Sequence, residues 1–366
     1  MMLAVQSPRI LKQGLMFNRT FDIEGRKIGD GEPPLVVAEI SGNHGGSLDG
    51  ALELITACAD AGAEAVKFQT YTPDTITLKS DAPAFRVEGQ LWAGRTLHDL
   101  YEEAHTPFEW HEAMFAHARK LGLIAFSAPF DPSAVDLLSK LDAPAYKIAS
   151  CELVDIGLIE KVAATGKPVM VSTGAAADEE LAEALAVLAA HGLDDVCVLH
   201  CISAYPTRME DANLASIPYI RGKYGVATGF SDHTLGLDAA LAAVALGASV
   251  IEKHVCLTRA GGAIDSAFSL EPQELKALIA QSRAVHAAIG KAKTAPLDVE
   301  KESLRFRRSL YVTKDLKKGQ VLDGANVRSV RPSGGLHPRH LPDVVGRTLV
   351  RDVPEGSPLS WDMLDE

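Results

Sequence analysis

Three lysines lie inside short apolar stretches of the sequence, where an unpaired ammonium group is costly. Lys67 occurs in AVKFQT, Lys147 in YKIAS and Lys253 in VIEKHV. Because burying an unpaired charge is strongly unfavourable, each lysine must either pair with its own carboxylate or share a common anion with the others. We favour a common phosphate or carboxylate, because hydroxyl donors end similar stretches: Ser150, Ser172, Thr173 and Ser231.

Two histidines also end apolar stretches that follow each other in the chain, His233 and His254. If these stretches form adjacent parallel strands, about 4.8 Å apart, both imidazoles can reach one ion. Two histidines with oxygen ligands suit a divalent first-row metal such as Mn²⁺ or Zn²⁺. A lone histidine is more often structural, but this pair predicts a metal site, with Mn²⁺ as the expected ion and Mg²⁺ or Co²⁺ as alternatives. The histidines between residues 98 and 117 are expected on the surface.

Further polar side chains follow the same pattern. Glu39 ends the first apolar stretch, Gln69 ends the second, Glu152 follows the fourth, and Ser203 and Tyr205 follow the sixth. Such residues become a single site only if the fold brings the ends of the stretches together.

The apolar stretches number eight in the first 260 residues, and most are separated by one amphipathic helix. They are continuous rather than alternating, as expected for strands buried on both faces of a parallel sheet. Eight βα units predict an α/β fold of the (β/α)₈ (TIM) barrel type, with the active site at the C-terminal ends of the strands. A miscounted strand would instead give an open sheet. The predicted strands are residues 36–40, 65–69, 124–127, 146–149, 169–172, 196–200, 226–230 and 250–255.

Two regions depart from this repeat. Residues 71–107 are too long for a simple connection, and we interpret them as an insertion that covers the substrate, with a surface excursion as the alternative. After residue 283 the chain changes character, which predicts a barrel over 20–283, a helical linker over 284–304 and a small, mostly β domain over 305–366. Within that domain, DLKKGQVLDGANV and DVPEGSPLSWDML repeat one β-turn-β pattern.

The composition limits the function classes. The 36 Lys and Arg against 48 Asp and Glu give a net charge of −12, which argues against a nucleic-acid-binding protein. Five scattered cysteines do not resemble a disulfide framework. We expect a cytoplasmic protein that does not bind membranes, because no apolar stretch resembles a signal peptide or a membrane span.

Taken together, the motifs resemble the sialic acid (nonulosonic acid) synthase family. The C-terminal stretch VTKDLKKGQVL…VRSVRPSGG resembles the antifreeze-like (SAF, β-clip) domain of that family. GQLWAGRTLHDLYEEAHTPFEWH and GGAIDSAFSLEP are most similar to the pseudaminic acid synthase branch, whereas Ala128 and Ser203 depart from residues typical of N-acetylneuraminate synthases. The matching barrel motifs are AEISGNHGG, AVKFQT, YKIAS with Glu152, VSTG, HCISAYPT, GFSDHTLG and EKHV.

The resemblance implies a transferase that condenses phosphoenolpyruvate with an open-chain acetamido-sugar, giving a nine-carbon 2-keto acid and phosphate. For this branch the sugar is 2,4-diacetamido-2,4,6-trideoxy-L-altrose, with N-acetylneuraminate or legionaminate synthesis as alternatives. Glu39 would be the general base, and a metal on His233 and His254 would polarise the aldehyde. The phosphate and carboxylate would be held by Lys67, Lys147, Ser150, Ser172 and Ser231, and the sugar would face Gln69, Tyr205, Glu152 and Asp265.

The resemblance also implies a domain-swapped homodimer, in which Arg331 of one SAF domain reaches the sugar in the barrel of the other copy. A Schiff-base aldolase with Lys147 or Lys67 as nucleophile is a rival interpretation, but it leaves the two histidines without a role. An ice-binding role for the C-terminal domain would leave the barrel residues unexplained.

Overall fold

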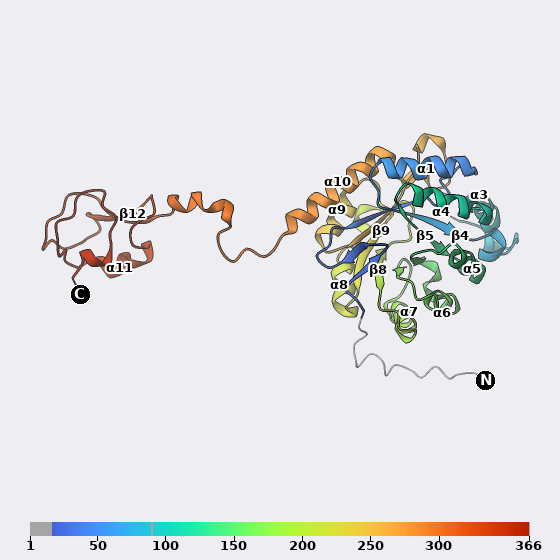
Figure 1. Cartoon of the computed structure of the whole chain (residues 1–366), viewed down its shortest axis with the longest axis horizontal. Coiled ribbons are helices and arrows are strands. Elements are labelled where there is room, and N and C mark those ends of the chain that lie inside the picture. Colours follow the sequence, from blue (N-terminus) through green and yellow to red (C-terminus); the bar gives the residue numbers. More distant parts are fainter. Residues whose placement is uncertain (1–16, 89–90, 366) are drawn as a thin grey trace. The chain divides into compact units, whose positions relative to one another are not determined.

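The computed structural model describes residues 17–88 and 91–365, and the chain divides into two compact units, residues 1–290 and 291–366 (Figure 1). In the first unit eight parallel strands close into a barrel in the spatial order β10-β3-β4-β5-β6-β7-β8-β9, which confirms the predicted (β/α)₈ barrel. These strands are β3 (Leu35–Glu39), β4 (Ala65–Thr70), β5 (Ile124–Pro129), β6 (Tyr146–Ile148), β7 (Val169–Ser172), β8 (Val196–Cys201), β9 (Ala227–Asp232) and β10 (Val250–His254).

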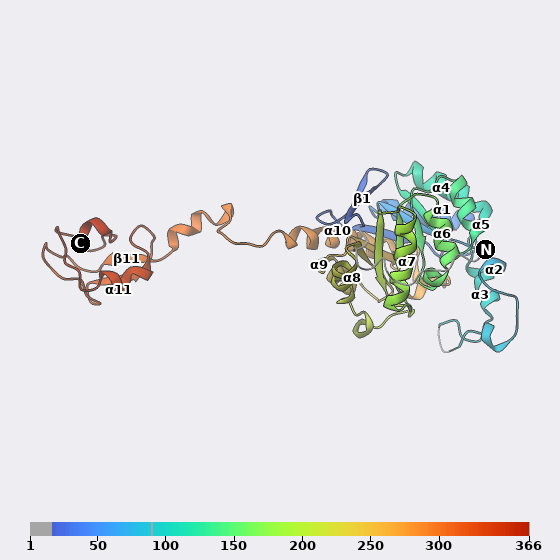
Figure 2. The same ribbon diagram turned by 90° about the horizontal axis from the view of Figure 1, so that it is seen from below.

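Helices surround the barrel and bury their apolar faces against the outer side of the strands (Figures 1 and 2). The first begins where the Ser47 side chain accepts a hydrogen bond from the Gly50 N–H, and the chain leaves it through Gly62 at φ +91°. None of the helices in the described residues is both long and apolar enough to cross a membrane. The helices of this unit are α1 (Leu48–Asp60), α2 (Pro73–Ile76), α3 (Leu97–Ala104), α4 (His111–Lys120), α5 (Pro132–Lys140), α6 (Ile156–Ala163), α7 (Asp178–Ala190), α8 (Ser216–Tyr224), α9 (Asp238–Ala245) and α10 (Pro272–Ile289).

The barrel interior has an apolar half and a polar half. Along each strand every second side chain points inward. Near the strand starts these are apolar residues such as Leu35, Ala65 and Val250, which form one buried cluster. Two and four residues further along the same strands they become Glu39, Lys67, Gln69, Glu252 and His254. The polar side chains are therefore gathered at the C-terminal ends of the strands.

A β-hairpin that the sequence analysis missed closes the N-terminal end of the barrel. It consists of β1 (Thr20–Ile23) and β2 (Arg26–Gly29), paired antiparallel. Its inward residues Phe21, Ile23 and Ile28 are buried with the apolar half of the barrel interior. Water is thus excluded from that end, and access to the interior is from the end that carries the polar residues.

The long connection between β4 and β5 is a folded excursion that contains α2 and α3 and is drawn in cyan in Figure 2. An isolated bridge pairs Arg86 with Thr96, so the segment doubles back on itself. Ile76, Trp92 and Tyr101 of this excursion contribute to the wall of the interior cavity. It therefore forms part of the cavity wall at the open end of the barrel, and its predicted role as a cover for the substrate stays a prediction.

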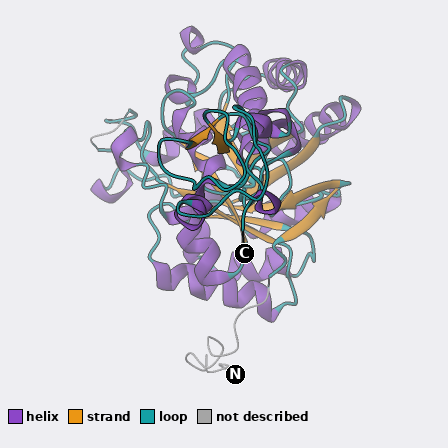
Figure 3. Cartoon of the chain, turned by 90° about the vertical axis from the view of Figure 1, so that its left-hand side faces the viewer, coloured by secondary structure: helices purple, strands orange, loops and turns teal. Residues whose placement is uncertain are grey.

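The second unit is a small β structure with its own apolar core, which includes Leu310, Leu322, Val344 and Leu359. Its regular elements are β11 (Ser309–Val312), paired antiparallel with β12 (Val327–Val330), and the short α11 (Leu341–Val344). Most of it is drawn as loop in Figure 3, because many pairings are single bridges. Helix α10 continues to Ile289, beyond the boundary predicted at residue 283, and between it and β11 only 3₁₀ turns occur, at 298–300 and 302–306.

The predicted repeat in this unit corresponds to two segments that bind each other reciprocally. The Asp315 carboxylate accepts the Glu355 N–H, and the Asp352 carboxylate accepts the Lys318 N–H, both at 2.9 Å. Asp315 and Asp352 occupy the same position in the two segments. The sequence repeat therefore reflects paired turns that stabilise each other.

Candidate active site

The polar end of the barrel opens into a cavity of about 420 Å³. Most of the side chains predicted to act together do line it, and they come from five strands and from segments that follow strands. Those lining the cavity are Lys67, Gln69, Lys147, Ser150, Glu152, Ser172, Tyr205, Ser231, His233, His254 and Asp265. Residues far apart in the sequence thus meet at one place because parallel strands end at the same rim of the barrel.

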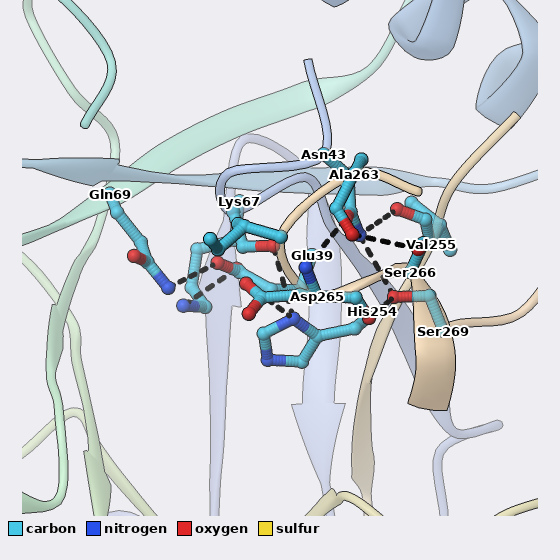
Figure 4. Close-up of polar contacts among 12 residues, drawn as sticks. Glu39, Asn43, Lys67, Gln69, His254, Val255, Ala263, Asp265, Ser266 and Ser269 are labelled. Carbon is cyan, nitrogen blue, oxygen red and sulfur yellow. Dashed lines mark hydrogen bonds and ion pairs between the residues drawn. The ribbon is translucent and has the colours of Figure 1, made fainter. Parts of the chain in front are cut away.

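Two of the three predicted lysines meet at one carboxylate on the cavity floor. Lys147 Nζ lies 2.9 Å from both carboxylate oxygens of Glu252, and Lys67 Nζ lies 3.8 Å from one of them. Lys67 Nζ also lies 2.6 Å from Glu39 Oε2, and Gln69 donates to Glu39 Oε1 at 3.1 Å (Figure 4). The floor therefore holds two ammonium groups and the Glu252 carboxylate, while the Glu39 carboxylate does not line the cavity and is buried against Lys67.

The charge on this floor depends on Glu39. Burial acts to raise the pKa of Glu252, but the ammonium groups of Lys147 and Lys67 lower this pKa to about 2. Glu252 therefore stays anionic. Burial raises the pKa of Glu39 despite the neighbouring Lys67. The two lysines and two glutamates therefore balance in charge while Glu39 is ionised, and the group carries one net positive charge once Glu39 takes up a proton.

The third lysine is not part of the site, and the prediction that Lys253 shares the common anion is wrong. Its Nζ lies 2.6 Å from Asp232 Oδ2, and both side chains are fully buried. Adjacent residues of a strand face opposite sides, so Lys253 and His254 cannot both point into the barrel. For the same reason Thr173, the neighbour of Ser172, does not line the cavity in the described structure.

Hydroxyl groups gather beside the lysines around Gly174. Ser150 Oγ accepts the Gly174 N–H at 3.0 Å. Ser172 Oγ and Ser203 Oγ are buried and have no hydrogen-bond partner among the described residues. A Cβ atom at Gly174 would collide with Ser203 Oγ and approach Ser150 Oγ to 2.7 Å. Ser203 therefore lies just behind the cavity wall, and the missing side chain of Gly174 leaves room for these hydroxyls.

The two strand-end histidines lie next to each other in the cavity wall, with ring centroids 5.3 Å apart and ring planes inclined at 60°. His233 Nδ1 donates to the Ile202 carbonyl at 3.0 Å, so Nε2 carries the lone pair when this ring is neutral. His254 Nδ1 lies 3.1 Å from Ser41 Oγ and 3.6 Å from Asp265 Oδ2. Burial, with the nearby His233 and Lys67, holds the pKa of His254 well below its ordinary value. Although burial opposes the shift, the neighbouring Cys201 raises the pKa of His233, so a protonated His233 ring must lose its Nε2 proton before the two histidines can both bind a divalent first-row metal.

Asp265 and Glu152 are acidic groups on the cavity wall. Asn43 fixes the first, because its Oδ1 accepts the Asp265 N–H at 3.1 Å while its Nδ2 donates to Val255 O and Ser269 Oγ (Figure 4). Burial, with the charge of Asp155 nearby, raises the pKa of Glu152 to about 7. Glu152 can thus hold or release a proton near neutral pH.

Some predicted residues lie elsewhere. Arg331 is exposed on the second unit, beside Arg307 and Arg308 in a shallow hollow of that unit. His98 and His111 are buried, contrary to the expected surface position. His111 Nε2 lies 2.8 Å from Thr70 Oγ1 behind the cavity, so it supports β4 rather than contacting solvent.

Several cavity residues receive no role from the sequence alone. Glu252 was visible in the stretch VIEKHV, and its even spacing from Val250 and His254 is the signal that places it inside the barrel. Trp92 and Ile264 come from loops, where no periodicity indicates direction. Cys201 also lines the cavity, and none of the five cysteines, all of which lie in the described residues, forms a disulfide.

Comparison with known proteins matches both units. Residues 54–294 match the model of the NeuB family, and residues 307–365 match the SAF domain. The chain is 44% identical to a pseudaminic acid synthase of Campylobacter jejuni subsp. jejuni, over 88% of this chain and 94% of that protein. It is 41% identical to the pseudaminic acid synthase of Helicobacter pylori, over 91% and 98% of the two chains. Among solved structures it resembles an N-acetylneuraminic acid synthetase from Leptospira borgpetersenii in complex with citrate, with a TM-score of 0.71, 31% identity and coverage of 79% and 96%.

Proposed function

Since this chain belongs to the NeuB family, we propose that it is a pseudaminic acid synthase. It would condense phosphoenolpyruvate with 2,4-diacetamido-2,4,6-trideoxy-L-altrose and water, giving pseudaminic acid and phosphate. The observation that carries this proposal is the placement of Lys67 and Lys147 on the floor of a cavity whose wall holds His233 and His254. An anion site and a histidine pair side by side suit the two substrates of this reaction.

The floor would bind phosphoenolpyruvate. Lys67 and Lys147 supply the ammonium groups, and Ser150, Ser172 and Ser231 supply hydroxyl donors to the phosphate and carboxylate oxygens. Ser172 Oγ is already buried without a partner in the described structure, so an incoming oxygen would satisfy it. Ser231 Oγ now donates to Glu252 Oε1 at 3.0 Å and would have to turn toward the ligand.

The histidine pair would hold a divalent metal through the two Nε2 atoms, Mn²⁺ in our proposal, with Mg²⁺ or Co²⁺ as alternatives. When bound, such an ion would act as a Lewis acid on the sugar's aldehyde oxygen. The Ile202 carbonyl fixes the tautomer of His233, and the low pKa of His254 keeps that ring neutral. Metal binding would displace the Nε2 proton of a protonated His233 ring, because the pKa of that group is raised.

The reaction joins C3 of the enol phosphate to the aldehyde carbon and leaves a cation at C2. Water then adds to C2, with Glu39 accepting its proton as a general base. One proton of the water ends on the former aldehyde oxygen and the other leaves with the phosphate as the C2–O bond breaks. Gln69 holds Glu39 through its 3.1 Å hydrogen bond, and Lys67 stabilises the carboxylate.

The sugar would lie against the outer part of the cavity. Gln69, Tyr205, Glu152 and Asp265 line the cavity and would offer hydrogen bonds to the hydroxyl and acetamido groups. We also propose that the protein acts in the cytoplasm as a domain-swapped homodimer, in which the exposed Arg331 of one copy reaches the acetamido group in the other. The small domain would then help to exclude water from the reaction.

The proposal is tested with the purified full-length chain, phosphoenolpyruvate and Mn²⁺. Each of three sugars is added separately: the L-altrose derivative, 2,4-diacetamido-2,4,6-trideoxy-D-mannose and N-acetylmannosamine. Phosphate release and product mass are measured, with EDTA as control. Turnover of the altrose derivative that EDTA abolishes is the expected result. Preference for another sugar would contradict the assigned substrate, and no release with any sugar would contradict the synthase itself.

A further inference from the structure

A group of apolar side chains from two loop regions lines the cavity and takes no part in the roles assigned above. They are called the apolar rim here: Ile76, Trp92, Leu100, Ala104 and Ile264. Four belong to the excursion after β4, which is drawn in cyan in Figure 2, and Ile264 belongs to the segment after β10. The rim therefore joins two segments that lie far apart in the sequence.

Four of the five rim side chains are brought together by contacts between the two segments. Leu100 and Ala104 are one helical turn apart on α3, so they lie on the same face. Ala104 and Ile264 both border Gly42, where a Cβ atom would lie 3.1 Å from the Ala104 carbonyl oxygen and collide with the Ile264 side chain. Trp92 is tied to the same place, because its Nε1 donates to the Ile264 carbonyl at 3.1 Å.

This hydrogen bond determines what Trp92 can offer a ligand. Nε1–H is the only donor of an indole, and the Ile264 carbonyl already accepts it. Trp92 therefore presents only hydrocarbon ring surface to the cavity, and the other rim side chains carry no polar atom. A methyl group fits such a surface, whereas a hydroxyl group would lose its water without gaining a hydrogen bond from these side chains.

A line of rings connects the rim to the reacting end of the cavity. The Tyr205 ring lies 4.5 Å from the His233 ring and 5.7 Å from the Trp92 ring, measured between centroids. A sugar whose aldehyde carbon lies at the histidines would pass along Tyr205 and reach the rim with its far end. In a six-carbon aldose that end is C6.

We propose that the apolar rim is the binding subsite for the C6 methyl group of a 6-deoxy sugar, with Trp92 as its main contact. The inference rests on the proposed synthase function and deepens it, because the rim would distinguish a 6-deoxy sugar from its 6-hydroxy counterpart. An apolar pocket rejects an added hydroxyl only moderately, so the expected discrimination is about 10- to 100-fold in kcat/KM.

The test uses two sugars that differ at C6 alone: 2,4-diacetamido-2,4,6-trideoxy-L-altrose and 2,4-diacetamido-2,4-dideoxy-L-altrose. Phosphate release gives kcat/KM for each with wild type, Trp92→Ala, Trp92→Phe and Leu78→Ala. Leu78 lies in the same excursion but is 65% exposed and does not line the cavity. We expect Trp92→Ala to lower kcat/KM about tenfold for the 6-deoxy sugar and much less for the 6-hydroxy sugar. Trp92→Phe, which keeps an aromatic ring but lacks the indole N–H, should retain the preference, as should Leu78→Ala.

Three outcomes would overturn the inference. If wild type uses both sugars equally well, the rim does not distinguish the two substituents at C6, although the synthase function still stands. If Trp92→Ala slows both sugars equally, or Trp92→Phe loses the preference as fully as Trp92→Ala, Trp92 acts only by anchoring the excursion to Ile264. If wild type releases phosphate with neither sugar while N-acetylmannosamine is turned over, the assigned sugar is wrong and the rim proposal fails with it.

Discussion

Lys147 Nζ lies 2.9 Å from each carboxylate oxygen of Glu252, on the floor of the cavity. Both side chains are at least 95% buried. Glu252 also accepts from Ser231 and lies 3.8 Å from Lys67, so one carboxylate engages three groups proposed to bind phosphoenolpyruvate. Glu252 therefore acts as the counter-charge of these groups, and a substrate anion must share them with Glu252 or displace its carboxylate from them.

Removal of this counter-charge should make the protein less stable and more responsive to phosphate. Glu252→Ala leaves Lys147 buried without its closest carboxylate, which should lower the free energy of unfolding by about 3–5 kcal/mol. Inorganic phosphate should restore part of that loss, because the freed lysines can bind it. Urea unfolding with and without phosphate measures both effects.

A matched control for this variant is Glu103→Ala, which breaks the surface ion pair of Glu103 with Arg95. Its cost should stay below about 1 kcal/mol, and phosphate should not change it. Equal stabilisation of Glu252→Ala and wild type by phosphate would contradict the role given to Glu252.

Lys67 and Lys253 should respond differently to substitution, although both interrupt apolar strands. Lys67→Ala removes a ligand of the substrate anion and should lower kcat/KM for phosphoenolpyruvate by about 100-fold or more, about 3 kcal/mol in transition-state stabilisation. The double variant Lys253→Met with Asp232→Asn removes a buried ion pair that faces away from the cavity. Asparagine is chosen because its amide oxygen would still accept the Thr234 N–H, as Asp232 does. This double variant should keep the wild-type KM for phosphoenolpyruvate, and a roughly tenfold rise in KM would contradict the assignment of Lys253 to the fold.

Gly174 should not tolerate a methyl group. A Cβ atom there would collide with Ser203 Oγ and crowd Ser150 Oγ. We expect Gly174→Ala to raise the KM for phosphoenolpyruvate about tenfold or more, because these hydroxyls border the proposed anion site. Gly157→Ala is the matched control, since the nearest atom to a Cβ atom there is Asp155 Oδ1 at 3.6 Å, an ordinary contact. Steady-state kinetics of the two variants would refute the prediction if both kept the wild-type KM.

The raised pKa of Glu152 predicts a pH dependence of stability. Its carboxyl group has a pKa of about 7 in the folded chain against an ordinary value of 4.5, with burial as the main cause. The folded state therefore keeps this proton while the unfolded state releases it, so the contribution to stability is full below about pH 4.5 and is lost as the pH rises through about 7. Glu152→Gln removes this dependence. Wild type should lose about 1–3 kcal/mol more than Glu152→Gln between about pH 5 and pH 8 in urea unfolding, and parallel curves would contradict the prediction.

Much of the barrel is readable from the sequence because its strands are continuous apolar runs. The predicted strand 169–172 coincides with β7, and the bounds of the other predicted strands differ from the observed bounds by one or two residues. The N-terminal hairpin escaped notice because its two four-residue strands are short and only their inward residues Phe21, Ile23 and Ile28 are apolar.

Site residues could be predicted where the residue type itself indicates chemistry. They could not be predicted where membership of the site depends on the direction in which a side chain points. His233, His254, Lys67 and Lys147 are unusual at strand ends, so their types drew attention to them. Lys253 looked equivalent, yet the two-residue period of a strand turns it outward to Asp232. Trp92 and Ile264 meet only through tertiary packing of two loops, which no local pattern in the sequence reports.

The central claim is that phosphoenolpyruvate is held by its phosphate on the lysine floor while carbon C2 is attacked by water. The most direct measurement uses phosphoenolpyruvate with ¹⁸O in the bridging position, the L-altrose derivative and Mn²⁺, with mass analysis of both products. Breakage of the C2–O bond predicts that the label leaves in the phosphate and that the nine-carbon acid is unlabelled. Unlabelled phosphate, with ¹⁸O retained on carbon, would mean that the P–O bond breaks instead and would contradict the account.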